Sequence, residues 1–514
     1  MRIAALDLGS NSFHLLVADV HPDGTFEAVA REKEMLRLGD DVTQNRRISP
    51  AAADRAVATV RRLKQLADAL GATEVLAKAT SALRSAENGS GLVDRIEVET
   101  GVEVEVISGL EEARLIFAAV RASVVIDPPP ALGIDIGGGS VEFMIGDSAG
   151  LRWAESLPLG VGRLTAEFVH DDPPSKTERK RLDDHIRGAL EPLLPDIISR
   201  SPTMCVGTSG TINDLARMAV ALQTGDIPAV SNGLRVSRDD LRTLHDRIIK
   251  AKIADRRRLP GLEEKRTELL PAGSLLLVTT LELFDIDTLT ISDWALREGI
   301  VLDAVVTHDP DDWSDDPRAL RRAAISNLAR RCNSDEEHTA HVTRLALRLF
   351  DEAQSLHDLG PDDREMLEFA AMVHDIGQHV SPRGHHRHAA YLVDHAHLRG
   401  FEPSEVQFLA TLTRHHRRGD PKPSEPRFAA LSATDRARVR KLAALLRVAD
   451  GLDRGRRGVV EDLTADVGAD LVILRLQVRG DPELALWGAR RRRDLFEQVF
   501  GREIEFALSA TQNV

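Results

Sequence analysis

The chain has 514 residues, more than a single hydrophobic core supports, so we expect three or four domains. Its net charge of −14 argues against nucleic acid as a specific partner, and its two distant cysteines argue against a disulfide framework or a thiolate zinc site. No secretory signal is recognisable at the start, and the longest apolar stretch, residues 272–286, is too short to cross a bilayer, so we expect a cytoplasmic protein without membrane contact.

The first three hundred residues read as two α/β segments. Strand patterns occupy residues 3–8, 13–20, 74–79 and 103–107, and helical patterns occupy residues 50–70 and 110–122. The proline-rich "IDPPPA" at 126–131 ends the first segment, and the second begins with predicted strands at 131–136 and 141–146. We therefore predict two α/β domains, at residues 1–125 and 126–307.

The remainder of the chain has a different pattern. The acidic, proline-flanked "HDPDDWSDDP" at 308–317 is typical of a linker. Helical periodicity dominates residues 318–457, and strand and helix patterns alternate again in residues 458–514. We predict an all-α domain followed by a small α+β domain.

Two short segments of the α/β part match each other. "ALDLGSNSFHL" at 5–15 and "GIDIGGGSVEF" at 133–143 both place a Gly/Ser turn after an aspartate, so that Asp7 aligns with Asp135. Glycine turns expose backbone N–H groups and serines add hydroxyl donors, a combination suited to phosphate oxygens. One such turn is equally typical of an ordinary hairpin, but two matching turns facing each other would hold a row of phosphates. The predicted phosphate-binding residues of these turns are Ser10, Asn11, Ser12, Gly137, Gly138, Gly139 and Ser140.

A third candidate anion site lies in "VGTSGTI" at 206–212. Gly207, Ser209 and Gly210 precede a predicted helix, whose first N–H groups attract anions. The same residues also suit a simple strand-to-helix turn.

The candidate general base is Glu112, in "ISGLEEARLIF". We predict that Ser108 caps the helix and that Glu111, three residues on, completes a capping box. Glu112 is not used by the cap and lies in the first helical turn, where it can activate water. The alternative is a structural carboxylate stabilised by the helix dipole.

Asp135 and Glu142 are the candidate metal ligands of this part. They flank the second turn, and a hairpin between them would direct both carboxylates toward the cleft. Two carboxylates with phosphate oxygens form a typical Mg²⁺ site. The first turn has His14 in place of Glu142, so we assign the metal to the second turn.

Five motifs together resemble one family. "LDLGSNSFHLLVAD", "TSALRSA", "VISGLEEARLIF", "IDIGGGSVEF" and "VGTSGTIND" are similar to the exopolyphosphatase/guanosine-pentaphosphate phosphatase family, within the actin, heat-shock ATPase and sugar-kinase superfamily. The resemblance implies duplicated actin-like (ribonuclease H-like) halves, Mg²⁺ or Mn²⁺ as cofactor and a homodimer. It also implies a catalytic role for Glu112, metal or phosphate binding at Asp135, Gly137 and Glu142, and phosphate binding by Arg84.

Longer members of this family carry a third domain similar to the HD phosphohydrolases. The order of a His, a His-Asp pair and a later Asp resembles the HD metal ligands and implies a second divalent ion, held by His338, His374, Asp375 and Asp450. The alternative is that these residues only pack the helices. We predict a capping box of Ser334 and Glu337 where His338 opens its helix.

The helical part is also rich in basic residues. Residues 414–457 carry thirteen Lys and Arg against five Asp and Glu, which suits either a polyanion or a solvated helix face. Histidines and arginines between residues 383 and 418 suit a polyphosphate track: His385, His386, His388, His415, His416, Arg383, Arg387, Arg417 and Arg418.

The predicted function is the release of orthophosphate from the end of inorganic polyphosphate. Hydrolysis of guanosine pentaphosphate (pppGpp) is the alternative substrate, although aromatic residues, at 4%, offer few partners for a guanine base. A kinase of the same superfamily and a non-catalytic sensor of polyphosphate or nucleotide are the alternatives from other classes.

Overall fold

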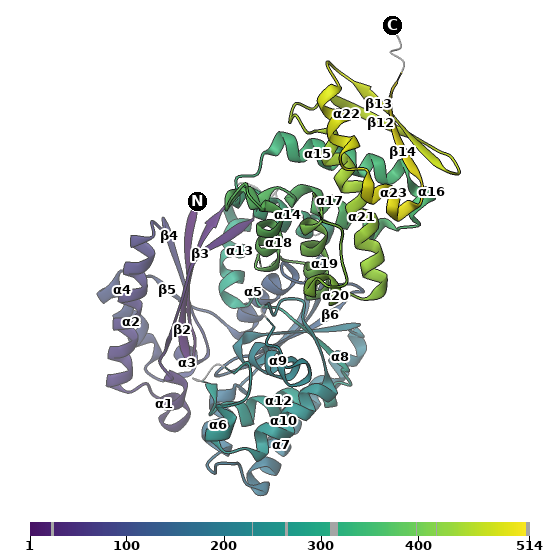
Figure 1. Ribbon diagram of the computed structural model, residues 1–514. Coiled ribbons are helices and arrows are strands. Elements are labelled where there is room, and N and C mark those ends of the chain that lie inside the picture. The colour runs from purple at the N-terminus through teal and green to yellow at the C-terminus, as the bar shows by residue number, and fades with distance from the viewer. Residues whose placement is uncertain are drawn as a thin grey trace. The chain divides into compact units, whose positions relative to one another are not determined.

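The computed structural model divides the chain into two compact units, residues 1–320 and 321–514 (Figure 1). It describes residues 1–21, 25–228, 230–262, 266–308, 317–396, 398–417 and 419–509. Residues 309–316 of the predicted linker and Arg418 of the predicted polyphosphate track therefore lie outside the described residues.

The first unit contains a five-stranded sheet with strand order β3-β2-β1-β4-β5. Its strands are β1 (Arg2–Leu8), β2 (Ser12–Val20), β3 (Phe26–Met35), β4 (Glu74–Ala79) and β5 (Val104–Val106). The first three are antiparallel and the last two run parallel to β1, and residues of α2 (Pro50–Ala69) and α4 (Gly89–Thr100) share the core on one face. Figure 1 shows these two helices side by side over the sheet.

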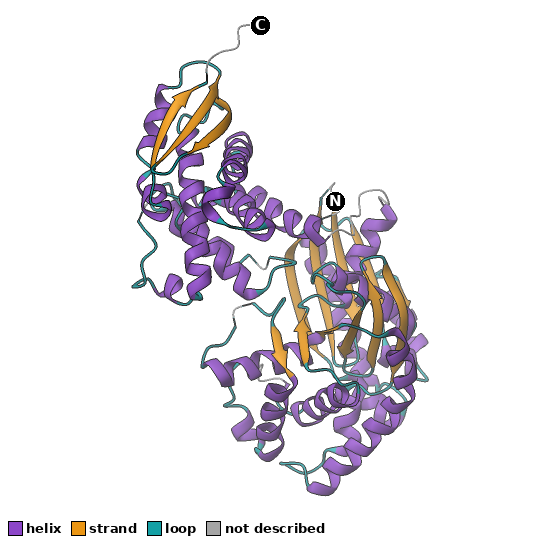
Figure 2. Ribbon diagram, turned by 90° about the vertical axis from the view of Figure 1, so that its right-hand side faces the viewer, coloured by secondary structure: helices purple, strands orange, loops and turns teal. Residues whose placement is uncertain are grey.

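A second sheet in the same unit repeats this strand order. Its order is β8-β7-β6-β9-β11-β10, with β6 to β8 antiparallel, β9 and β11 parallel to β6, and β10 added at the edge. The strands are β6 (Ala131–Ile136), β7 (Val141–Asp147), β8 (Gly150–Leu157), β9 (Met204–Thr208), β10 (Arg235–Ser237) and β11 (Thr288–Ile291), drawn in orange in Figure 2. The register pairs Asp7 with His14 in the first hairpin and Asp135 with Glu142 in the second, so the two turns occupy equivalent positions.

Two helices form a shared core with both sheets. Helix α5 (Gly109–Arg121) follows the first sheet but packs on β7 and β8 of the second, whereas α13 (Leu296–His308) follows the second sheet and packs on β1 and β2 of the first. Gly299 allows this close approach, because a Cβ there would lie 2.1 Å from the carbonyl oxygen of Leu115. The exchange of helices joins the two halves into one body.

The remaining helices of the first unit fall into two groups: longer helices that pack on the second sheet, and shorter ones. On the second sheet, residues of α7 (Lys176–Leu190), α9 (Ser209–Thr224), α10 (Arg238–Lys250) and α12 (Leu270–Leu283) share one hydrophobic cluster with the strands. The shorter helices are α1 (Leu38–Asn45), α3 (Ser81–Ser85), α6 (Val161–Phe168), α8 (Leu194–Arg200) and α11 (Ile253–Arg256).

The second unit packs helices and a small sheet around one core. Its longer helices are α14 (Pro317–Arg331), α15 (Glu336–Glu352), α17 (Pro361–Val373), α18 (His385–Asp394), α19 (Pro403–Arg414) and α21 (Ala433–Leu452). Two shorter ones are α16 (Gln354–His357) and α20 (Pro426–Ala429). The sheet consists of β12 (Val460–Val467), β13 (Leu471–Val478) and β14 (Glu503–Leu508), accompanied by α22 (Glu483–Arg490) and α23 (Asp494–Phe500).

The strands and helices predicted for the α/β part are confirmed, but the two capping boxes are not. The hydroxyl of Ser108 accepts the N–H of Glu111 at 3.1 Å as predicted, whereas the Glu111 carboxylate pairs with Arg114 instead of closing the box. Before α15 the cap is Asp335, which accepts the N–H of His338, because the helix begins one residue later than the predicted cap requires. In the described part of the chain, the structure contains no helix with the length and apolar character needed to span a membrane.

Candidate functional site

The two Gly/Ser turns contact each other in the first unit. A Cβ on Gly138 would lie 2.5 Å from Cγ of Asn11, and a Cβ on Gly139 would lie 2.5 Å from Oγ of Ser10. These described glycines have no positive φ, so they are required for the close approach of the turns and not for a left-handed backbone. The prediction that the turns face each other is confirmed.

The turns line a cavity of about 160 Å³. Most predicted phosphate-binding residues are in its wall, namely Ser10, Asn11, Ser12, Gly137, Gly138, Gly139, Ser140, Ser209 and Gly210. Glu112 and Asp135 also line it. Gly207 does not line the cavity. It lies within β9, where a Cβ would contact Ile212 and Leu289, so packing requires a glycine at this position.

Sequence reasoning missed part of this wall. Thr80 and Ser81 begin α3 after β4, as Thr208 and Ser209 begin α9 after β9, and Ser81 lines the cavity together with Ser209. The signal was present in the sequence, because "KATSALR" at 78–84 repeats the pattern of "VGTSGTI". Among the described residues, the cationic side chains of the wall are Lys33, Arg266 and Arg297; they come from segments in which we recognised no motif and could not be found in that way.

Helix α5 carries Glu112 onto the second sheet. Glu112 is 7% exposed, and its Oε2 accepts a hydrogen bond from Nη1 of Arg84 at 3.2 Å. Arg84 also donates to the carbonyl oxygen of Ile107 at 2.7 Å and is not among the residues that line the cavity. The two hydrogen bonds of Arg84 therefore hold the Glu112 carboxylate in place.

Four carboxyl groups gather beside the turns. Burial raises the pKa of Asp7 to about 6, that of Glu142 to about 7 and that of Asp135 to about 8. Burial, and then the charge of Glu142, raise the pKa of Glu112 well above its ordinary value. Ser156 donates to Oε1 of Glu142 at 2.8 Å, which favours the ionised form. An enclosed group of mutually repelling carboxyl oxygens fits a hard divalent cation such as Mg²⁺ or Mn²⁺.

Glu298 is the counterpart of Glu112 in the second half. By sequence pattern, "ALREG" at 295–299 aligns with "GLEEA" at 109–113, although Glu298 is the third residue of α13 and Glu112 is the fourth residue of α5. Its buried carboxylate pairs with Arg31 at 2.6 Å and accepts the N–H of Ala295 at 3.0 Å. Burial opposes its ionisation, but Arg297 and Arg31 outweigh this and hold its pKa below the usual range. Of the two duplicated glutamates, only Glu112 lines the cavity.

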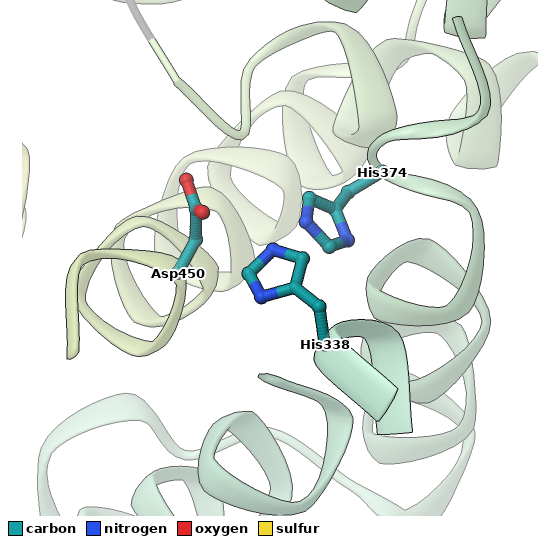
Figure 3. A group of neighbouring side chains, drawn as sticks. All are labelled: His338, His374 and Asp450. Atoms are coloured by element: carbon teal, nitrogen blue, oxygen red, sulfur yellow. The ribbon is translucent and has the colours of Figure 1, made fainter. Parts of the chain in front are cut away.

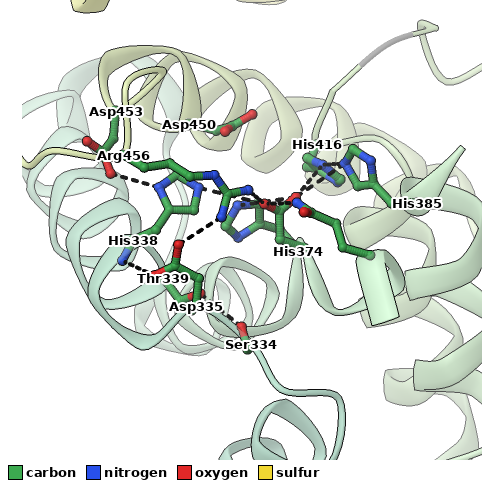
Figure 4. A network of polar contacts seen from close by, with 12 residues as sticks. Ser334, Asp335, His338, Thr339, His374, His385, His416, Asp450, Asp453 and Arg456 are labelled. Atoms are coloured by element: carbon green, nitrogen blue, oxygen red, sulfur yellow. Dashed lines mark hydrogen bonds and ion pairs between the residues drawn. The ribbon is translucent and has the colours of Figure 1, made fainter. Parts of the chain in front are cut away.

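The second unit contains two groups of metal-ligand side chains. In each group, one ligand atom per residue lies within 4.8 Å of the others. The first group contains three of the predicted ligands (Figure 3): His338, His374 and Asp450. The second contains the fourth predicted ligand, Asp375, and two further histidines, His385 and His416, both labelled in Figure 4.

The predicted polyphosphate track is wrong for three of its histidines. His385, His415 and His416 are buried, so they cannot form a surface track. Basic residues of the stretch 414–457 also form ion pairs within the unit, which the composition did not indicate. Five of its arginines pair with carboxylates of the same unit: Arg414, Arg427, Arg438, Arg447 and Arg456.

The profile of the Ppx/GppA phosphatase family matches residues 16–308, and that of Ppx/GppA phosphatase domain III matches residues 320–481. The chain belongs to the Ppx/GppA phosphatase family. Exopolyphosphatase 1 of Mycobacterium tuberculosis is 37% identical over 307 residues, which are 59% of this chain and 88% of that protein. Exopolyphosphatase 1 of Mycobacterium leprae is 35% identical, over 59% of this chain and 89% of that protein.

Solved structures with a similar fold include members of this family. A crystal structure of an exopolyphosphatase from Cytophaga hutchinsonii is 32% identical with a TM-score of 0.56, over 60% of this chain and 98% of that one. A Ppx/GppA family member from Aquifex aeolicus is 30% identical with a TM-score of 0.52, over 60% of this chain and 99% of that one. The mixed α/β sheets of this Ppx/GppA phosphatase match those structures. Glu112, Asp135 and Glu142 fall in the first matched segment, and the predicted ligands of the helical unit fall in domain III.

Proposed function

We propose that this Ppx/GppA phosphatase is an exopolyphosphatase, which releases orthophosphate from the end of inorganic polyphosphate. The observation that carries the proposal is the pair of equivalent turns that line one cavity with Glu112 in its wall. The curated relatives named exopolyphosphatase support it, since this chain covers most of their length.

The chain's own residues have distinct roles in this reaction. Backbone and hydroxyl donors of the two turns hold the terminal phosphoryl groups, and Lys33, Arg266 and Arg297 offset their charge. Arg84 holds Oε2 of Glu112, so we assign Oε1 as the atom that accepts a proton from the attacking water. Arg84 then acts as a positioning residue, and its predicted contact with phosphate stays a prediction.

Asp135 and Glu142 are the residues proposed to hold Mg²⁺ or Mn²⁺. Their oxygens suit a hard cation. Their pKa values are raised because the site is buried and other carboxylates lie nearby, so a cation bound there would be favourable. A divalent ion bound there supplies positive charge that offsets the charge of the transferred phosphoryl group. Positive charge there would lower the pKa of the nearby Glu112 and favour the ionised form, which can act as a base.

Guanosine pentaphosphate is the second candidate substrate. The family includes phosphatases of both names, and the cavity recognises phosphoryl groups without a feature that measures chain length. Among the described residues that line it, however, there is no Phe, Trp or Tyr on which guanine could stack. We therefore favour polyphosphate.

The test compares phosphate release from long-chain polyphosphate and from guanosine pentaphosphate, for the wild type and for Asp375→Ala. We expect release from polyphosphate by both proteins, because Asp375 lies in the helical unit. Loss of release in Asp375→Ala alone would transfer the reaction to that unit. Binding without release would indicate a sensor, and formation of ADP from ATP with a sugar would indicate a kinase.

Domain III is proposed to hold a second divalent ion on His338, His374, Asp375 and Asp450. Three of these ligands converge in the structure and the fourth is adjacent. The homodimer implied by the family stays a prediction, which light scattering of the purified chain would check.

A further inference from the structure

A second cavity, of about 940 Å³, lies in the helical unit. Its wall is formed by residues of α14, α15 and α17, by the turn between α14 and α15, and by one residue of β12. Pockets of about 300 to 1,000 Å³ hold small organic molecules and cofactors. This cavity is therefore large enough for a ligand of nucleotide size, and it shares no residue with the cavity of the first unit.

Part of the wall is apolar. Ala329 of α14, Ala340 and Leu347 of α15, and Met372 of α17 contribute to it. The small side chains leave room for a ligand, and a methionine adapts its shape to one. An inorganic phosphate chain has no apolar surface to bury here, so these residues fit a ligand with an apolar or flat body. Among the described lining residues there is no Phe, Trp or Tyr, but an arginine can stack on a flat ring.

Two ion pairs fix arginines in the wall. Arg364 donates to both oxygens of Asp351, from Nε at 2.7 Å and from Nη2 at 2.8 Å, and Arg348 donates from Nε to Oδ1 of Asp462 at 3.1 Å. A guanidinium has five N–H donors, so Arg364 has further donors for an anion after this pairing. The aspartates therefore hold the arginines in place without using all of their hydrogen-bonding capacity.

Arg344 is a lining arginine whose charge is not neutralised in this way. It donates from Nη2 to Nδ1 of His341 at 2.7 Å and from Nη1 to the carbonyl oxygen of Glu461, which are both uncharged acceptors. Among the described residues, no carboxylate forms an ion pair with it. A guanidinium that faces a cavity and lacks an anionic partner fits a phosphoryl group, which it can bind through two parallel hydrogen bonds.

The other end of α15 contributes acceptors instead. Glu336 lies in its first turn and lines the cavity together with Asn333 and Ser334 of the preceding turn. Along the helix axis, Glu336 is about 12 Å from Arg344. The Glu336 carboxylate has no hydrogen bond or ion pair with another described residue, so it can accept N–H donors of a ligand. The cavity thus combines a cation, an apolar middle and a carboxylate.

We propose that this cavity binds a nucleoside phosphate, with the phosphoryl groups at Arg344 and the base at Glu336. The base and ribose fill the part of the wall formed by Ala340 and Leu347. A carboxylate accepts two adjacent N–H donors, which guanine offers on one edge and adenine does not, so guanosine phosphates fit better than adenosine phosphates. The ligand belongs to the second unit and is separate from the substrate proposed for the first.

The experiment measures binding to the full-length chain by titration calorimetry, with the non-hydrolysable imido analogues of GTP, ATP and inorganic triphosphate. Ala340→Leu fills the cavity without changing a charge, and because Ala340 is exposed the fold accommodates the larger side chain. The relevant signal is the binding that this substitution removes, since a nucleotide bound in the first unit is unaffected by it. We expect such a signal with the GTP analogue. Its absence, or an equal signal with the triphosphate analogue, would overturn the proposal.

Two further variants test the two ends of the cavity. Arg344→Ala should weaken binding of the GTP analogue by about ten- to hundredfold, as expected for the loss of a charge-assisted hydrogen bond. Arg457→Ala, an exposed arginine outside the wall, is the matched control and should bind normally. Glu336→Gln should reduce the preference for the GTP analogue over the ATP analogue. Equal affinities of the two arginine variants, or an unchanged preference in Glu336→Gln, would refute the assigned orientation of the ligand.

Discussion

Replacement of Glu112 by Gln separates its proposed role from a structural one. The side chains have the same shape, and Gln retains an oxygen that can accept the hydrogen bond of Arg84, which is 3.2 Å long in the structure. The substitution therefore preserves the packing of α5 and removes the proton acceptor. General-base catalysis contributes about 10²- to 10⁴-fold, so we expect kcat for phosphate release to fall by about that factor with little change in KM.

The same variant should gain stability when no metal is bound. Burial and Glu142 raise the pKa of Glu112, so at a pH above the ordinary range of a carboxyl group this side chain lowers the stability of the metal-free fold, and a neutral Gln removes that cost. Phosphate release from long-chain polyphosphate and thermal unfolding in a chelator measure the two effects. Glu111→Gln is the matched control: its carboxylate is partly exposed and pairs with Arg114, so we expect normal activity and a change in stability of about 1 kcal/mol at most. Activity of Glu112→Gln within about threefold of the wild type, well below the range for a general base, would refute the assignment.

Three further predictions concern the same unit. Gly139→Ala places a Cβ 2.5 Å from Ser10 and should destabilise the fold by about 1–3 kcal/mol and reduce phosphate release, whereas Gly188→Ala, with no neighbour within 4 Å, should stabilise helix α7 by about 1 kcal/mol in thermal unfolding. Burial raises the pKa of Asp135 to about 8, so without metal the folded protein keeps this proton up to about that pH, whereas the unfolded chain releases it near pH 4. Asp135 therefore lowers the stability of the fold progressively as the pH rises between these two values. Asp135→Asn should therefore gain Tm relative to wild type from pH 5 to 8, and a constant difference would contradict this. Arg84→Lys should lower kcat more than it raises KM if Arg84 positions Glu112, and the reverse result would make it a phosphate ligand.

The sequence was informative wherever function depends on a local pattern. The aspartate, the turn and the following strand are contiguous, so the duplication of Asp7 and Asp135 predicted two equivalent hairpins that the register confirms. The hydroxyl cap of Ser108 was predictable for the same reason. The cap before α15 was not, because Ser334 and Asp335 are both good caps and the helix start decides between them.

Contacts between distant segments were beyond the sequence. Lys33 and Arg297 belong to β3 and α13, and nothing near them in the chain indicates that they line one cavity with Glu112. The histidines of residues 385 and 416 looked like a basic surface, because composition reports charge but not burial. Only the packing of α18 and α19 shows them beside Asp375.

By itself the sequence determined the paired hairpins, the capped helix that carries Glu112 and the family's order of motifs, because each depends on residues close together in the chain. The tertiary structure decided on which of the two sheets α5 and α13 pack. Since α5 packs on the sheet of the other half, Glu112 joins Asp135 and Glu142 in a single acidic cluster. The burial and mutual charge of that cluster, which set its pKa values and its fit to a cation, arise only when both halves have folded together.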